Sequence, residues 1–185
     1  MEEKIDIVTK EGEPTGKTAL KSEAHKNGWY HNTIHLWLYT SDGQILLQQR
    51  SHKKAIFPLL WDVSVAGHIN ASETFTEAAL RETKEEIGLE LNPDQLIKIG
   101  VHLYESSYKD GAIADNEFHH VYISELPVDP NQLIPQEDEV EALKLVSINE
   151  FKKLLHDSAA NNHFVTTNKQ YYYFVLNAIK KQLHK

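Results

Sequence analysis

The stretch GHINASETFTEAALRETKEEIGL, residues 67–89, carries most of the information about fold and chemistry in this chain. Apolar or β-branched side chains recur at every fourth position, at Phe75, Ala79, Thr83 and Ile87. That period predicts a helix over residues 72–87 with one buried stripe. We expect Ser72 to be its N-cap and Gly88 to end it as a left-handed residue.

Three glutamates mark a second feature of this helix. Glu82, Glu85 and Glu86 stand at i, i+3 and i+4, so they share one helical face. Their mutual repulsion weakens the helix by about 0.2–0.5 kcal/mol per pair, and a bridging cation would remove that penalty. Hard oxygen ligands select Mg²⁺, Mn²⁺ or Ca²⁺. The alternative is a solvated acidic face on a surface helix.

Composition narrows the class of protein around this helix. The 185 residues are 41% apolar and 25% charged, which is typical of one globular domain. No cysteine is present, which excludes disulfides, thiolate metal sites and cysteine nucleophiles. The net charge of −8 argues against a nucleic-acid partner. No apolar run predicts a membrane span or a secretory signal, and we expect a cytoplasmic protein.

The rest of the chain alternates strand and helix signals. Strands are predicted over residues 5–9, 35–40, 44–49, 96–104, 118–124 and 142–146. Residues 10–16 read as a turn, and residues 41–43 as the turn of a hairpin. Two further helices are predicted over 148–156 and 168–183. Hairpins and crossovers together favour an α/β or α+β sandwich.

The spacing within residues 67–89 resembles the Nudix box. The fixed positions of that motif are met by Gly67, Glu73, Arg81, Glu82, Glu85, Glu86 and Gly88. Leu89 fills the final aliphatic position, and Thr83 stands where an aliphatic residue is usual. Seven matched positions over 23 residues favour this interpretation over the solvated acidic face.

The resemblance implies an α/β fold, the Nudix α/β/α sandwich with a mixed, curved β-sheet and a loop–helix–loop metal site. We expect a single Nudix domain over residues 1–185. Its core would span about residues 30–150, and C-terminal helices would occupy residues 148–185.

The resemblance also implies a metal-dependent hydrolase that cleaves diphosphate linkages. The implied ligands of Mg²⁺ (or Mn²⁺) are Glu82, Glu85, Glu86 and the carbonyl of Gly67. Arg81 belongs to the implied catalytic set, and its ion pair with Glu73 would hold the loops.

The general base stays open at this point. Glu82 or Glu86 could take the proton from the attacking water, and in some family members a glutamate on a distant loop does so. Glu137 and Glu139 are the candidates for that role, and their alternative is a solvated acidic loop.

A second resemblance covers residues 5–146, to the Nudix branch that contains type 1 isopentenyl-diphosphate isomerase. The matching stretches are residues 49–54, 61–68 and 115–117. The resemblance implies a second metal site, whose ligands would be His25, His31, His68, Asp115 and Glu117. The alternative is that these residues pack and form hydrogen bonds without a metal.

The isomerase resemblance fails at one residue. Those isomerases use a cysteine directly before the Gly-His pair, and this chain has Ala66 there. An alanine cannot transfer a proton, so we favour hydrolysis over isomerisation. A non-catalytic diphosphate-sensing module is a third hypothesis, and the intact glutamates argue against it.

Residues outside the box complete the expectations. Arg50, Lys53 and Lys54 are expected to bind the diphosphate, with surface solvation as the alternative. The aromatic run 171–174 predicts packing or a homodimer contact. The expected partner is a small-molecule diphosphate, and the sequence does not identify it.

Overall fold

A computed structural model of the chain describes residues 2–161, 163–164 and 168–184. Its strands are β1 (Lys4–Val8), β2 (Pro14–Leu20), β3 (His31–Tyr39), β4 (Gln44–Arg50), β5 (Trp61–Asp62), β6 (Val65–His68), β7 (Ile97–Tyr108), β8 (Ile113–Glu125) and β9 (Val140–Ser147). Its α-helices are α1 (Lys21–Asn27), α2 (Phe75–Ile87), α3 (Ile148–His156), α4 (Ser158–Asn161) and α5 (Lys169–Leu183). Short 3₁₀ turns are η1 (Pro93–Gln95), η2 (Lys109–Gly111) and η3 (Pro130–Gln132).

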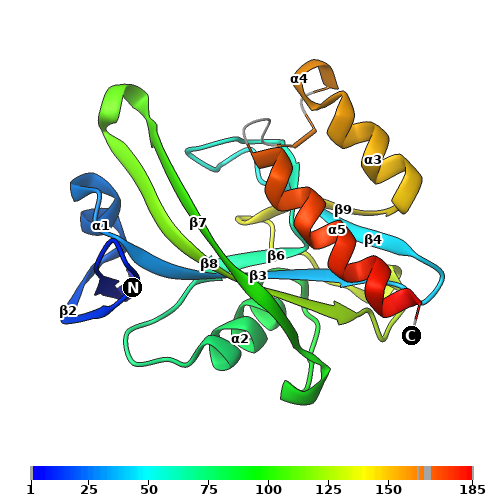
Figure 1. The fold of residues 1–185 in the computed structure, drawn as a ribbon, viewed down its shortest axis with the longest axis horizontal. Helices are drawn as coiled ribbons and strands as arrows, with labels where there is room; N and C mark the ends of the chain where they lie inside the picture. Colours follow the sequence, from blue (N-terminus) through cyan, green and yellow to red (C-terminus); the bar gives the residue numbers. More distant parts are fainter. Residues whose placement is uncertain (1, 162, 165–167, 185) are drawn as a thin grey trace.

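The strands form one mixed sheet centred on β3, as the α/β expectation required. β3 pairs in parallel with β8 along its whole length and antiparallel with β6 on its other side. β7 and β8 form a long hairpin that crosses the molecule (Figure 1). β4 connects β3 to β5 and β9. None of the helices in the described part of the chain combines the length and apolar character needed to cross a membrane.

β3 separates two hydrophobic layers because its side chains alternate between the faces of the sheet. Leu36 and Leu38 pack in the layer that contains α2. Trp37 and Tyr39 pack in the opposite layer, with α3 and α5. Figure 1 shows α2 on the side of the sheet away from α5. At the other end of the same strand, polar side chains replace the apolar ones, and this is where the cavity described below lies.

The start of α2 corrects the sequence prediction. The helix begins at Phe75, and Thr74 is the N-cap, forming a capping box with Glu77. Ser72, the predicted N-cap, has a φ of 70° and lies in the turn before the helix. Gly88 ends the helix in the left-handed conformation, as predicted.

Other differences from the prediction concern segments whose pairing is long-range. β2 occupies part of residues 10–16, predicted as turn, because Pro14–Leu20 pairs with β1. β7 and β8 extend beyond their predicted ranges, because each completes the other's backbone hydrogen bonds. The short elements α1, β5 and β6 were not predicted from the sequence.

Candidate active site

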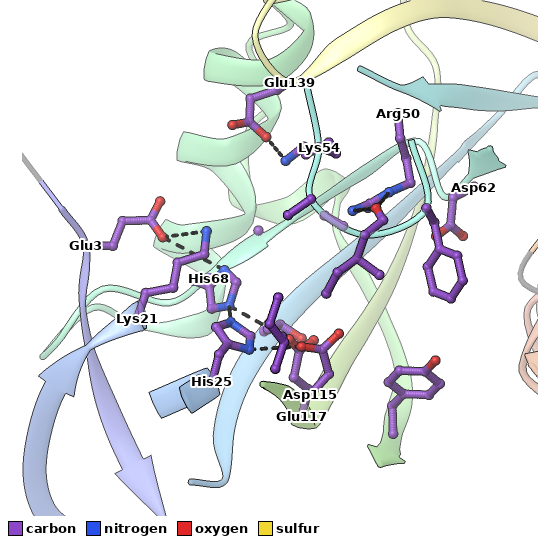
Figure 2. Close-up of a pocket in the computed structure, with 18 of the residues that line it drawn as sticks. Glu3, Lys21, His25, Arg50, Lys54, Asp62, His68, Asp115, Glu117 and Glu139 are labelled. Carbon is purple, nitrogen blue, oxygen red and sulfur yellow. Dashed lines mark hydrogen bonds and ion pairs between the residues drawn. The ribbon is translucent and has the colours of Figure 1, made fainter. Parts of the chain in front are cut away.

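Most of the predicted glutamates, histidines and basic residues line one cavity of about 630 Å³. α2 contributes the glutamates, α1 and β6 contribute histidines, and the β4–β5 loop contributes Lys54. Figure 2 shows Arg50 and Asp62 on one side of this cavity, and His25, His68 and Lys21 on another. Residues from both ends of the chain therefore line a single space.

Glu86 is the most buried carboxylate of the cluster, with 3% of its surface exposed. Its Oε2 accepts hydrogen bonds from Gln48 Nε2, at 2.8 Å, and from the backbone N–H of Ala66, at 3.3 Å. Burial, reinforced by the charge of neighbouring Glu82, raises the pKa of Glu86 to about 7. The two donors fix Oε2 and leave Oε1 for another ligand.

Glu82 lies against Gly67, which explains why that position must be glycine. A Cβ on residue 67 would overlap the carboxylate of Glu82. Burial raises the pKa of Glu82, although the Arg81 guanidinium, 2.8 Å from Glu82 Oε1, opposes the shift. Glu85 is half-exposed, at 3.1 Å from the same guanidinium. The packing of β6 on α2 therefore buries Glu86 and Glu82 and leaves Glu85 half-exposed.

Arg81 connects this helix to the preceding loop. Its Nε and Nη2 each lie 2.8 Å from one oxygen of Glu73, which is a bidentate ion pair. Nη2 also donates to the carbonyl of His68 at 2.9 Å. The guanidinium therefore fixes β6 and the loop before α2 relative to the glutamates.

The residues fit a hard divalent cation. Two buried carboxylates of like charge lie side by side, and burial works against their ionised forms. Because Gly67 has no side chain, its backbone can lie directly against the Glu82 carboxylate. An oxygen-only donor set of this kind suits Mg²⁺ or Mn²⁺.

A second cluster is formed by three histidines and one glutamate. Ligand atoms of His25, His31, His68 and Glu117 all lie within 4.8 Å of one another. The Nε2 atoms of His25 and His68 are 3.2 Å apart. Glu117 Oε1 lies 3.6 Å from His31 Nε2 and 3.8 Å from His68 Nε2. These residues come from α1, β3, β6 and β8, so only the folded chain assembles them.

Two rings of this cluster are suited to metal binding, whereas, although burial opposes the shift, Asp115 and Glu117 raise the pKa of His25. His31 Nδ1 lies 2.9 Å from the Trp29 carbonyl and donates to it, which leaves Nε2 as the lone-pair atom. That buried Nε2 has no hydrogen-bond partner among the described residues. Burial and the nearby Lys21 cation hold the pKa of His68 well below its usual range, so this ring is neutral.

Asp115 takes a different place from the other predicted members of the set. Its Oδ1 lies 2.9 Å from His25 Nδ1, on the far side of that ring from the cluster. It is not among the four residues whose ligand atoms converge. The hydrogen bond of His25 Nδ1 is to the Ala114 carbonyl, at 3.3 Å, and Asp115 contacts the same nitrogen as an ion-pair partner.

The basic residues do not all reach the cavity. Arg50 lines it and donates from Nε and Nη2 to the Ile56 carbonyl. Lys54 lines it and pairs with Glu139, and burial together with the Arg50 charge lowers the pKa of Lys54 to about 8. Lys53 is not part of the cavity wall and pairs with Asp138 at the surface.

The two distant glutamates also separate. Glu139 lines the cavity, and Glu137 is not among its lining residues. Two glutamates separated by a single residue therefore take different places, and Gln136 lines the cavity with Glu139. Sequence alone did not distinguish them.

Several cavity residues were not predicted from the sequence. Gln48 donates a hydrogen bond to Glu86. The one feature of the sequence that could have indicated this role is a polar residue at a buried position of β4. Lys21 pairs with Glu3 at 3.0 Å beside the histidine cluster. Asp62 and His35 line the cavity as well. Strand pairing brings Gln48, Asp62 and His35 to the site, and Lys21 reaches it from the start of α1.

Comparison with known proteins gives one family. The NUDIX domain family model matches residues 29–167. Nudix hydrolase 3 of Arabidopsis thaliana is 40% identical over 83% of this chain, which spans only 20% of that protein. An uncharacterized Nudix hydrolase of Clostridium acetobutylicum is 34% identical over 83% of this chain and 74% of its own length. An isopentenyl-diphosphate Delta-isomerase of Nocardia farcinica is 31% identical over 84% of this chain and 86% of its own.

Solved structures agree on the fold. A crystal structure of a Deinococcus radiodurans protein superposes with a TM-score of 0.61 at 23% identity. The match covers 86% of this chain and 90% of the other.

Proposed function

Since the chain belongs to the NUDIX family, we propose that it is a pyrophosphohydrolase that uses Mg²⁺ or Mn²⁺ to cleave the diphosphate linkage of a nucleoside-diphosphate derivative or a similar metabolite. The observation that carries the proposal is the pair of buried carboxylates, Glu82 and Glu86, packed against Gly67 at the wall of a large cavity. A purely structural role does not require two buried like charges.

In this proposal Glu82, Glu85, Glu86 and the Gly67 carbonyl hold the cation. The bound cation would neutralise the diphosphate charge and make an attacking water easier to deprotonate. Arg50 and Lys54, which line the same cavity, bind phosphate oxygens. Arg81 acts through Glu73 and the His68 carbonyl, which keep the glutamate helix in place.

The reaction is an attack of water on one phosphorus atom. A new P–O bond forms, the bridging P–O bond breaks, and a carboxylate accepts the proton of the water. Among the distant glutamates we assign this role to Glu139, because it lines the cavity. Its carboxylate pairs with Lys54 at the cavity wall, within the same space as the glutamates of α2.

We further propose that His25, His31, His68 and Glu117 hold a second divalent ion, with Asp115 orienting His25. The convergence of four ligand atoms and the unpartnered His31 Nε2 support this assignment. Imidazole ligands favour a transition metal over Mg²⁺ at this position.

The isomerase and sensor hypotheses remain competitors. Similarity to isopentenyl-diphosphate isomerases extends over most of the chain. The methyl group of Ala66, at the position of the isomerase cysteine, cannot exchange a proton with carbon. A sensor would bind a diphosphate without turnover.

One experiment tests all three hypotheses. The protein is incubated with Mg²⁺ or Mn²⁺ and a panel of nucleotide sugars, dinucleoside polyphosphates, nucleoside triphosphates and isopentenyl diphosphate. We expect phosphate-containing hydrolysis products from at least one member. Binding without hydrolysis would support a sensor, and an isomerised product from isopentenyl diphosphate would support the isomerase.

The second metal is tested by metal content. Dialysis against Mn²⁺ or Zn²⁺ and then metal-free buffer should leave about one tightly held ion per chain, by analogy with structural sites of three or more protein ligands. His25→Gln should lose that ion, and Glu86→Gln should retain it. An unchanged content in His25→Gln would contradict the assignment.

A further inference from the structure

The part of the cavity beside Asp62 contains polar groups that neither metal site uses. His35 and Asp62 both line the cavity, from β3 and β5. The charge of Arg50 acts on both side chains, which places them in one neighbourhood. Figure 2 shows Asp62 beside Arg50 and away from His25 and His68.

Strand register connects both residues to the glutamate centre. His35 is the cross-strand partner of Ala66, and Asp62 is the cross-strand partner of Gln48. Ala66 and Gln48 are the two donors that hold Glu86. A molecule whose diphosphate lies at Glu86 can therefore extend toward His35 and Asp62.

The hydrogen bonds of the Tyr171 hydroxyl determine which ring nitrogen of His35 carries the proton. Tyr171 OH lies 2.9 Å from Trp37 Nε1 and 2.6 Å from His35 Nδ1. An indole N–H can only donate, so the Tyr171 oxygen accepts from Trp37. Among the described residues His35 Nδ1 is the one acceptor for the buried Tyr171 O–H, which therefore donates to it. The neutral ring consequently carries its proton on Nε2. Burial, assisted by neighbouring His119, holds the pKa of His35 well below its usual range and keeps the ring neutral.

Asp62 offers the complementary group. Burial raises the pKa of Asp62, and the charge of Arg50 opposes that shift. Its Oδ1 accepts from Tyr172 OH and from the backbone N–H of Val63, each at 2.8 Å. Oδ2 makes no hydrogen bond to any residue that the structure describes, and it is not closed off from solvent. The side chain thus offers an acceptor to the cavity.

His35 Nε2 is the matching donor. It too has no partner within the described chain and is not closed off from the cavity. The ring is held in place by stacking on His119, with centroids 4.0 Å apart. Consecutive tyrosines of α5 therefore orient one donor and one acceptor toward the same space.

We propose that His35 and Asp62 are specificity-determining residues that bind, as donor and acceptor, a hydroxylated organic group carried by the diphosphate. The inference rests on the proposed function for the position of the diphosphate. A hydroxyl group both donates and accepts, so a sugar-like group matches the pair. A hydrocarbon group would leave the two polar atoms unmatched, and each lowers affinity by about tenfold or more.

The test is calorimetric binding in the presence of Mg²⁺, which does not depend on turnover. The probes are a methylene-bridged analogue of a nucleoside diphosphate sugar, methylenediphosphonate, which has no organic group, and isopentenyl diphosphate. Asp62→Asn preserves the shape and the Oδ1 acceptor but can replace the free acceptor by a donor. We expect its Kd for the sugar analogue to rise about tenfold or more, with the Kd for methylenediphosphonate unchanged within about twofold.

Variants of His35 and α5 sharpen the test. His35→Leu should weaken binding of the sugar analogue as Asp62→Asn does, and His35→Gln should restore much of it by supplying an amide donor. Tyr172→Phe, which removes one of the two donors to Asp62 Oδ1, should weaken it less than Asp62→Asn does. Tyr173→Phe is the matched control, because Tyr173 is exposed on the same helix, and it should have no effect.

Three results would overturn the inference. The first is an unchanged Kd for the sugar analogue in both Asp62→Asn and His35→Leu. The second is an equal loss for methylenediphosphonate, which would place these residues at the diphosphate. The third is a wild-type protein that binds isopentenyl diphosphate as tightly as the sugar analogue, or does not bind the analogue. Failure of hydrolysis in the wild type would instead count against the proposed function.

Discussion

Burial shifts the pKa of the carboxylates Glu82 and Glu86 in this cavity more than neighbouring charges do. Glu86 and Glu82 stand four residues apart on one helix, and both have a raised pKa because the fold buries them. Glu85 is one residue away from Glu86 and is half-exposed. Neighbouring glutamates of one motif therefore carry different electrostatic costs, and the deepest one should matter most for metal binding.

Glu86→Gln should lower metal-dependent turnover by about a thousandfold or more, since losing about 4 kcal/mol of metal-supplied stabilisation has that effect. The metal-free variant should be no less thermally stable than the wild type, because the buried charge beside Glu82 is gone. The measurements are hydrolysis at saturating Mn²⁺ and thermal melting with and without metal. Glu85→Gln is the matched control and should lose less activity. An undiminished rate in Glu86→Gln would refute its assignment as a ligand.

His163, which does not line the cavity, gives a pH prediction. Its ring stacks on Trp61, and burial together with the Lys144 cation lowers the pKa of His163 to about 4. The folded pKa lies below the unfolded value of about 6.5, so the unfolded chain binds the proton first. The stability that neutral His163 provides is complete above pH 6.5 and is lost as the pH falls toward 4.

The prediction is a comparison of urea unfolding for wild type and His163→Gln at pH 7 and pH 5. The free energy of unfolding should differ between the two proteins in favour of wild type at pH 7, and this difference should shrink at pH 5. His156→Gln, on the exposed surface of α3, is the control. A difference that is constant with pH would contradict the stated cause.

At the level of elements, α2 is positioned by its two ends and by its contact with β6. Thr74 and Glu77 satisfy the first free N–H groups, and Gly88 completes the other end. Glu82 then fits against β6 only because residue 67 has no side chain. Single substitutions at the ends of α2 or at residue 67 should therefore change the free energy of unfolding measurably.

The corrected N-cap gives opposite effects for two neighbouring residues. Thr74→Ala should lower the free energy of unfolding by about 1 kcal/mol, because the capping oxygen is lost. Ser72→Gly should raise it by about 0.5–1 kcal/mol, because Ser72 adopts a φ of 70° that glycine tolerates better. Chemical denaturation measures both. If Ser72→Gly destabilised the protein by as much as Thr74→Ala, Ser72 would be acting as a cap.

Gly67→Ala tests the packing of β6 on α2. The new Cβ meets the Glu82 carboxylate, so we expect a loss of about 1–3 kcal/mol and most of the activity. In a Glu82→Ala background the same change should destabilise the fold much less, because the clash is absent. A double-mutant cycle measures this coupling. Additive effects would show that the two residues do not meet.

At the scale of the whole molecule, the cavity connects segments that are distant in the chain. α1, β3, β6 and β8 each supply one member of the histidine–glutamate cluster. α5 supplies the tyrosines behind His35 and Asp62. Occupation of the cavity should therefore stabilise the fold as a whole.

Metal removal is the corresponding prediction. Mn²⁺ at about 100 times its Kd should raise the free energy of unfolding by about 2.7 kcal/mol for one site, since it binds only the folded chain. A chelator should reverse the increase. His25→Gln and Glu86→Gln should each remove part of it, and the double variant should remove nearly all. A wild-type melting temperature that does not change when Mn²⁺ is added would contradict both metal assignments.

The sequence by itself determined the features that depend on local spacing. The four-residue period predicted α2, the glutamates fell on one face of it, and Gly88 marked its end, because helical geometry relates residues only three or four positions apart. The apolar run 35–40 likewise predicted the second half of β3, and the box spacing with the isomerase resemblance named the glutamates and most of the histidine cluster of the cavity.

Only the tertiary structure decided which of those residues meet. Lys53 and Lys54 are adjacent, yet only Lys54 reaches the cavity, and of Glu137 and Glu139 only Glu139 does. The run 171–174 was predicted to pack or to form a dimer contact, and Tyr171 proved to hold His35 inside the fold. The physical reason is that strand pairing and helix docking set these contacts over separations of up to 136 residues, which no local period encodes.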